Sequence, residues 1–228
     1  MIGMVIPAHN EERLLGPCLA AACVAARHPD LQGTPVRIVV VLDGCSDGSE
    51  NIVFRSGIQA LVISACNVGV ARATGAAHMI AQGAQWLAFT DADSRVAPDW
   101  LVAQLSLRTD AVCGSVQVED WDEHPARLRE IWGERYCDAD GHRHVHGANL
   151  GVSVQAYQRA GGFPPLACGE DVALVELLRA TGASICWSAA PRVTTSARLR
   201  ARVRGGFGDT LAAWARQGDP GGAPGQDC

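Results

Sequence analysis

The stretch IGMVIPAHNEE at residues 2–12 is an apolar, β-branched run that ends in polar residues, and VRIVVVLDGCSDGS at residues 36–49 repeats that pattern. Between them, residues 14–26 carry apolar side chains at the spacing of one helix face. A strand, a helix and a second strand predict a βαβ unit. Because both strands are apolar throughout, we expect a parallel sheet with helices on both faces.

The alternation continues outward from this unit. We expect a helix after Ser49, a strand at residues 61–63, a helix at 70–82 and a strand at 86–90. The less regular second half predicts a helix from residue 98, a strand at 111–118, a helix at 124–136, a strand ending near residue 150, helices at 154–160 and 170–180, and a strand at 184–187. The fold class is therefore α/β, a single Rossmann-like domain with a central, mostly parallel mixed sheet flanked by helices.

Length and composition fit one such domain. The chain has 228 residues, of which 48% are hydrophobic and 19% charged, so it can bury a sizeable core. We place the domain at residues 1–215 and a flexible C-terminal tail at residues 216–228, because Gly, Pro, Asp and Gln dominate from Gln217 onward.

Three features of the composition limit where we expect the protein to reside and what we expect it to bind. No apolar run approaches the roughly 20 residues of a transmembrane helix, so we expect no membrane-spanning segment. The nine cysteines are scattered without a C-x-x-C pair, which favours reduced thiols and a cytoplasmic protein. A net charge of −5 argues against nucleic acid as a partner.

The chain contains no lysine, and all 19 basic residues are arginines. A P-loop lysine and a Schiff-base mechanism are therefore excluded. A phosphate bound by a side chain would have to be bound by arginine, whose fork suits bidentate contact.

Polar residues gather where the predicted strands end, which is where open parallel sheets bind ligands. These residues are His9, Asn10, Glu11 and Glu12, which follow Pro7 after the first strand, Asp43, Ser46 and Asp47 after the second, and Asp91 and Asp93 after the strand at 86–90. So many carboxylates on one rim repel each other unless a cation or hydrogen-bond donors compensate them. Asp91 and Asp93, two residues apart, could share a hard cation with diphosphate oxygens. The alternative is that these side chains cap helices and turns.

Seven segments together resemble family 2 glycosyltransferases with the GT-A fold. They are residues 5–12, 43–49, 67–72 and 91–93 in the first half, and 147–149, 161–163 and 169–171 in the second. Their order and spacing match that family over roughly residues 2–210. The resemblance implies a metal-dependent, inverting enzyme that moves a sugar from a nucleoside-diphosphate sugar to an acceptor, which the sequence does not identify.

The resemblance also implies roles for single residues. The nucleotide-sugar site would comprise Pro7, His9, Asn10, Glu12, Asp43, Arg72, Asp91, Asp93 and Asn149. Asp93, aided by Asp91, would bind Mn²⁺ or Mg²⁺. Asp171 would be the catalytic base, and Glu170 would position it or contact the acceptor; both also lie at a helix start, where negative charge is stabilised in any case. His9 replaces the phenol often found at its position, which leaves UDP-, GDP- and dTDP-sugars open as donors.

Several alternatives stay open at this level. Cys137, His142, His144 and His146 could converge on zinc. The arginine-rich segment Arg192–Arg204 could be a flap over the diphosphate, a solvated basic face, or a peripheral contact with anionic lipids. The enzyme could act with retention, or the chain could be a nucleotide-sugar-binding protein without catalysis. A sugar nucleotidyltransferase is disfavoured because residues 7–12 form no Gly-rich loop with a basic residue. The sequence does not predict the oligomeric state.

Overall fold

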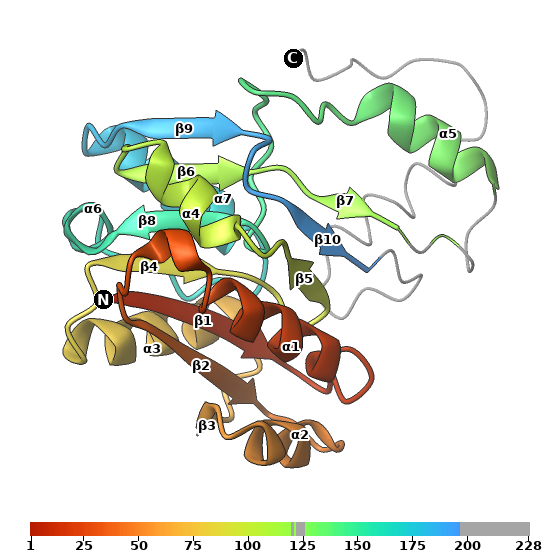
Figure 1. Cartoon of the computed structure of the whole chain (residues 1–228), viewed down its shortest axis with the longest axis vertical. Coiled ribbons are helices and arrows are strands. Elements are labelled where there is room, and N and C mark those ends of the chain that lie inside the picture. Colours follow the sequence, from red (N-terminus) through yellow and green to blue (C-terminus); the bar gives the residue numbers. More distant parts are fainter. Residues whose placement is uncertain (120, 122–125, 197–228) are drawn as a thin grey trace.

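A computed structural model describes residues 1–119, 121 and 126–196. Its centre is a seven-stranded sheet with the strand order β3-β2-β1-β4-β8-β6-β9 (Figure 1). The strands are β1 (Ile2–Ala8), β2 (Val36–Asp43), β3 (Gln59–Ile63), β4 (Trp86–Phe89), β6 (Ala111–Gly114), β8 (Leu150–Ser153) and β9 (Ile185–Ser188). The expected α/β class is confirmed.

The sheet is mixed because one strand runs against the others. β8 pairs antiparallel with both β4 and β6, whereas the pairs β1–β2, β1–β4, β2–β3 and β6–β9 are parallel. The prediction of a strand that ends near residue 150 is wrong, since β8 begins at Leu150 and leads directly into a helix. Single apolar residues occur on both sides of that point, with Val145 and Ala148 before it and Leu150 and Val152 after it, so the local sequence does not show where pairing starts.

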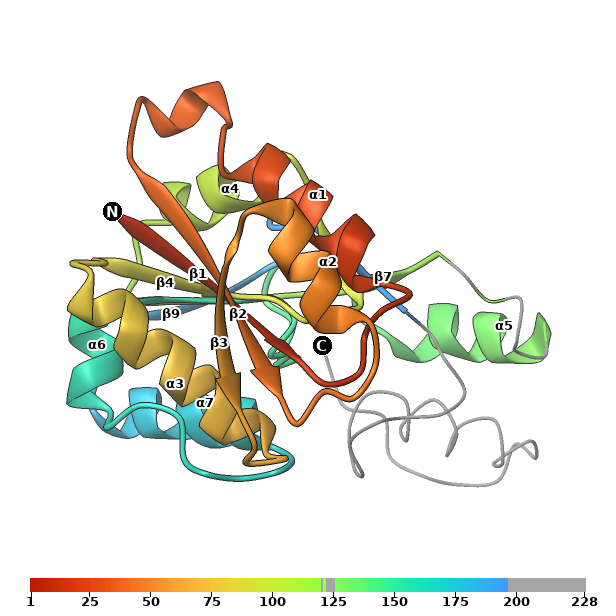
Figure 2. The same cartoon turned by 90° about the horizontal axis from the view of Figure 1, so that it is seen from below.

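Helices cover both faces of this sheet (Figure 2). One face carries α1 (Leu15–Ala25), α2 (Ser49–Ser56), the 3₁₀ turn η1 (Pro29–Leu31) and α4 (Trp100–Ser106); the other carries α3 (Val68–Ala81), α6 (Val154–Arg159) and α7 (Glu170–Ala180). Neighbouring residues of β1 point to opposite cores: Met4 and Ile6 pack with α1, and Val5 packs with α3. Both cores are buried, which explains why the strands are apolar throughout.

A second, three-stranded sheet lies beyond the carboxyl end of the first (Figure 1). It consists of β5 (Ser94–Val96), β10 (Val193–Thr195) and β7 (Gln117–Val118), with α5 (Ala126–Arg135) beside it. The prediction of one strand at residues 111–118 is therefore wrong, because β6 and β7 belong to different sheets. The chain turns at Ser115 and Val116, whose polar groups bond to Asp138 and Tyr136.

Two details place α3 against the sheet and the site. The side chain of Asn67 caps the helix by accepting a hydrogen bond from the Val70 N–H at 3.0 Å. Gly75 lets the helix approach the strands closely, because a β-carbon there would collide with the Val5 side chain. The helix therefore directs residues of its first two turns towards the carboxyl ends of β1 and β4.

Some expectations fall partly or wholly outside the described residues. These are the domain boundary at residue 215, the tail at 216–228, and all of Arg192–Arg204 beyond residue 196. In the described part of the chain, no helix combines the length and apolarity needed to span a membrane. Seven cysteines there are free thiols.

Candidate active site

Asp43 ends β2 and is buried, and its carboxylate is bound by backbone N–H groups of the loop before α3. Its Oδ1 accepts from Ala65 at 2.7 Å and from Cys66 at 2.8 Å, and its Oδ2 accepts from Asn67 at 2.8 Å. These bonds offset the cost of burying a charge. Asp43 thereby fixes the loop of residues 64–67 on the rim of the sheet.

His9 and Asn10 tie the loop after β1 to the loop after β2. The Nδ1 of His9 donates to the backbone oxygen of Asp43 at 2.6 Å, which holds an exposed imidazole on the rim. Asn10 adopts a φ of 54°, and its Oδ1 accepts from the Ser46 N–H at 2.7 Å. An amide side chain that bonds locally tolerates this left-handed conformation.

Pro7 and Glu12 lie on the same rim. Pro7 is buried within β1, where it stands opposite Val41 of β2. The Oε2 of Glu12 accepts from the Gly48 N–H at 2.8 Å, and the Glu12 N–H donates to Asp47 at 3.0 Å. Asp47 also accepts from the Ser49 N–H at 3.0 Å, so the capping and turn interpretation is correct for Asp47.

Arg72 of α3 is 3% exposed and bridges two carboxylates. Its two terminal nitrogens donate separately to Asp91, just after β4, and to Glu170, at the start of α7. Glu170 is itself buried. The guanidinium lies above the ring of Phe163, with its carbon 5.9 Å from the ring centroid. Arg72 supplies the positive charge that a rim of carboxylates requires.

Asp91 and Asp93 follow β4. The side chain of Asp91 is 36% exposed; desolvation raises its pKa, and the adjacent Arg72 opposes that rise. The Oδ1 of Asp93 accepts from the Ser94 hydroxyl at 3.2 Å. Among residues 1–119, 121 and 126–196, no group of three or more His, Cys, Asp or Glu side chains is arranged to hold a metal ion. Two carboxylates fit a hard cation only when oxygens of a ligand complete its shell.

Asp171 lies half-buried in the first turn of α7, and its carboxylate bonds to backbone N–H groups. Its Oδ2 accepts from the Gly147 N–H at 2.7 Å, and its Oδ1 accepts from the Val172 N–H at 2.8 Å. Gly147 also lies against Arg72, because a β-carbon at that position would collide with the guanidinium. The two adjacent carboxylates therefore differ: Glu170 is buried in an ion pair with Arg72, and Asp171 is half-buried and bound by backbone N–H groups.

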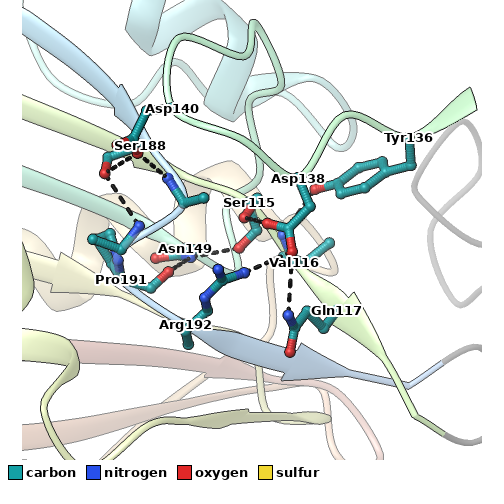
Figure 3. A network of polar contacts seen from close by, with 12 residues as sticks. Ser115, Val116, Gln117, Tyr136, Asp138, Asp140, Asn149, Ser188, Pro191 and Arg192 are labelled. Carbon is teal, nitrogen blue, oxygen red and sulfur yellow. Dashed lines mark hydrogen bonds and ion pairs between the residues drawn. The ribbon is translucent and has the colours of Figure 1, made fainter. Parts of the chain in front are cut away.

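Asn149 differs from the other predicted ligand-binding residues, since it is completely buried. Its Nδ2 donates to the backbone oxygens of Ser115 at 2.7 Å and Pro191 at 2.8 Å, and its Oδ1 accepts from the indole of Trp100 at 2.8 Å. Figure 3 shows it between the chain segments that lead into the second sheet. These contacts favour an architectural role.

Asp138 extends this polar network (Figure 3). Its carboxylate accepts from the Ser115 hydroxyl, from the Gln117 amide at 3.2 Å and from Arg192 at 2.6 Å. Burial acts to raise the pKa of Asp138, but these hydrogen bonds outweigh it, so the pKa lies below its ordinary value. Arg192, the first residue of the arginine-rich segment Arg192–Arg204, is thus bound to Asp138.

The histidines of the zinc alternative are occupied with other partners. The Nε2 of His144 accepts from the Cys137 N–H at 3.2 Å, and the Nδ1 of His142 accepts from the His144 N–H at 3.1 Å. His146 bonds to the Tyr136 hydroxyl at 2.9 Å, and burial lowers its pKa to about 4. The described residues hold no metal-binding group here, and the zinc interpretation is unsupported.

Comparison with known sequences now decides the family. The sequence profile of "Glycosyl transferase family 2" matches residues 4–157. The chain belongs to this family. No curated protein matches the sequence of this family 2 chain.

Solved structures show the same fold. TarS from S. aureus, in complex with UDP-GlcNAc, matches with a TM-score of 0.64 at 14% identity, over 90% of this chain and 61% of that one. A mannosyltransferase from Pyrobaculum calidifontis, in complex with GDP-Man and Mn²⁺, matches with a TM-score of 0.56 at 18% identity, over 83% of this chain and 57% of that one. The family 2 chain has the GT-A fold, and it spans less than two thirds of these two structures.

The structure arranges the predicted residues of this family 2 chain in two groups on one edge of the sheet. His9, Asn10, Glu12 and Asp43 lie after β1 and β2, and Arg72, Asp91, Glu170 and Asp171 lie around the end of β4. Since β1 pairs with both β2 and β4, the groups are neighbours. The sequence marks the segment 147–149 but does not predict that the Gly147 backbone N–H binds Asp171.

The buried amide of Asn149 leads to a stability prediction. Asn149→Ala leaves the Trp100 indole and two backbone oxygens without their partner, so we expect a loss of about 2–4 kcal/mol in the free energy of unfolding. Urea unfolding followed by tryptophan fluorescence measures it. Asn51→Ala, at an exposed position of α2, is the control and should change stability by less than about 0.5 kcal/mol. Equal effects of the two variants would contradict the architectural role.

Proposed function

We propose that the chain is an inverting glycosyltransferase that uses a divalent cation and a nucleoside-diphosphate sugar. The observation that carries the proposal is the meeting of Asp91, at the end of β4, with the start of α7 through Arg72 and Glu170. This contact brings the pair Asp91 and Asp93 near Asp171, which is held by Gly147. Family membership and the GT-A fold support the same reaction class.

Each group of the site has a part in the proposed reaction. The acceptor oxygen forms a bond to the anomeric carbon as the bond from that carbon to the diphosphate oxygen breaks. Asp171 takes the proton from the acceptor hydroxyl, since it is a carboxylate held open to the site by two backbone N–H bonds. Displacement from the face opposite the leaving group inverts the anomeric configuration.

The donor would lie along the rim between the two groups of residues. Asp93, with the free oxygen of Asp91, would hold Mn²⁺ or Mg²⁺, which supplies electrostatic stabilisation of the leaving diphosphate when bound. The exposed imidazole of His9, fixed by its bond to Asp43, would stack on the nucleotide base. Solved neighbours contain UDP-GlcNAc or GDP-Man, so we propose UDP- and GDP-sugars as the first donors to test, followed by dTDP-sugars.

The proposal is tested by ligand-dependent stability. Thermal unfolding is measured with UDP, GDP or dTDP, each with Mn²⁺, Mg²⁺ or EDTA. At a ligand concentration of about 100 Kd, we expect the matching nucleotide and cation to raise Tm by about 5–10 °C, and EDTA to remove most of that rise. Release of nucleoside diphosphate from the corresponding sugar nucleotide then separates an enzyme from a binding protein. A chain that no nucleotide stabilises with any cation would contradict the proposed donor site.

A further inference from the structure

Arg72 has a position that a nucleotide contact does not explain. It is almost completely buried, and its terminal nitrogens both donate to carboxylates of the protein. These carboxylates, Asp91 and Glu170, are 19 and 98 positions away in the sequence. A buried guanidinium is stable only when its charge is paired, and here one cation serves two anions. Its paired nitrogens are therefore directed into the protein.

The surroundings of Arg72 fix the orientation of its guanidinium plane. The ring of Phe163 lies on one side, and Gly147 lies so close that any β-carbon there would collide with the terminal nitrogens. The N–H of the same glycine donates to Asp171 at 2.7 Å. A displacement of Arg72 would therefore disturb Asp91 through one nitrogen, Glu170 through the other, and Asp171 through Gly147.

We propose that Arg72 is a positioning residue. It holds Asp91, on the donor side, at a fixed distance from the Glu170–Asp171 turn, on the acceptor side. In this role Arg72 does not contact the nucleotide, and Glu170 acts through Arg72 and not on the acceptor. The inference rests on the proposed function, because the two sides have these meanings only in a glycosyltransferase. The structural part of the inference is the energetic coupling of Arg72 to Glu170, which can be measured without enzymatic turnover.

The main test is Arg72→Lys. A lysine keeps the charge, but its single ammonium cannot reproduce two parallel donors in a fixed fork. We expect kcat for release of UDP from UDP-GlcNAc, or of GDP from GDP-Man, to fall about 100-fold, with KM for the donor within about threefold. The Kd of UDP or GDP, measured by titration calorimetry, should stay within about threefold. A Kd weakened more than about tenfold, with kcat maintained, would identify Arg72 as a nucleotide contact and overturn the proposal.

Glu170→Gln provides the second variant. It keeps the shape of the side chain and removes its charge, and we expect the same fall in kcat with unchanged nucleotide affinity. Because both residues act through one contact, the double variant should lose little more kcat than Arg72→Lys alone. Independent, multiplicative losses would contradict the shared role. Arg179→Lys, in an exposed ion pair on α7, is the matched control and should leave kcat unchanged.

Stability and metal binding keep the inference testable if the wild-type protein turns over no donor. Urea midpoints of the two single variants and the double variant should then shift less than additively, whereas additive shifts would refute the coupling. Binding of Mn²⁺ in the presence of UDP or GDP, followed by electron paramagnetic resonance, should weaken several-fold in Arg72→Lys. A protein that binds no nucleotide but shows coupled midpoints would disprove the proposed function and leave the structural content of the inference standing.

Discussion

Replacing Asp171 with asparagine is expected to lower the rate of nucleoside-diphosphate release by about 1000-fold, while donor affinity stays within about threefold. We expect the Asp171 carboxylate to take the proton of the acceptor, because the neighbouring Glu170 is paired with Arg72. Asparagine has nearly the same shape, but its amide cannot take up the proton. The rate is measured with the sugar nucleotide that gives turnover, and donor binding by calorimetry.

Two comparisons make the Asp171→Asn result specific. Glu176→Gln changes an exposed carboxylate on the same helix, which pairs with Arg179, and should keep wild-type activity. Circular dichroism and Tm show whether the Asp171→Asn protein still folds, because the variant can keep only one of the two backbone hydrogen bonds of the carboxylate. A variant that folds, binds donor and still transfers at the wild-type rate would exclude Asp171 as the base. Retention of the anomeric configuration in the product would exclude the inverting mechanism.

The main sheet and its helices could be predicted because their signals are local. An apolar run of β-branched residues followed by polar residues marks β1 and β2, and a helical period marks α7, whose predicted range of 170–180 agrees with the structure. These segments bury one face or both faces along their whole length. Burial of this kind leaves a periodic pattern that is visible without knowledge of the partner.

The second sheet could not be predicted, because its strands have two or three residues and pair across long distances. β5 pairs with β10 through Ser94 and Thr195, about 100 positions apart, and the two side chains also share a hydrogen bond at 2.9 Å. β7 pairs with β10 over two residues. Segments this short carry no usable alternation, so tertiary contacts and not local propensity decide their conformation.

The location of the candidate site follows from the sequence, but the partners of its charges do not. Carboxylates that follow parallel strands lie on one rim of the sheet, and their negative charges require a cation or hydrogen-bond donors beside them. In the structure, Arg72 compensates the charges of Asp91 and Glu170, and backbone N–H groups bind the carboxylates of Asp43 and Asp171. Almost any residue can supply a backbone N–H group, so these donors cannot be recognised in the sequence. The Arg72–Glu170 pair joins residues 98 positions apart, so local sequence does not predict it either.

Replacing Asp93 with alanine tests the other half of the proposed chemistry. We expect the rate of nucleoside-diphosphate release to fall about 100- to 1000-fold at Mn²⁺ and donor concentrations that saturate the wild-type protein, because the leaving diphosphate loses electrostatic stabilisation. Asp91 alone would offer the cation a single oxygen, since its other oxygen is bound to Arg72. Binding of Mn²⁺ with UDP or GDP, followed by electron paramagnetic resonance, should be lost in parallel.

The control for Asp93→Ala is Asp99→Ala, which removes an exposed carboxylate that makes no capping hydrogen bond to α4. It should leave both activity and Mn²⁺ binding unchanged, so that a general effect of reduced negative charge is separated from loss of a ligand. Full metal-dependent activity in Asp93→Ala would assign the cation to other residues. Activity that is lost while Mn²⁺ binding persists would instead give Asp93 a direct role in holding the donor sugar, because the cation would then be bound without its carboxylate.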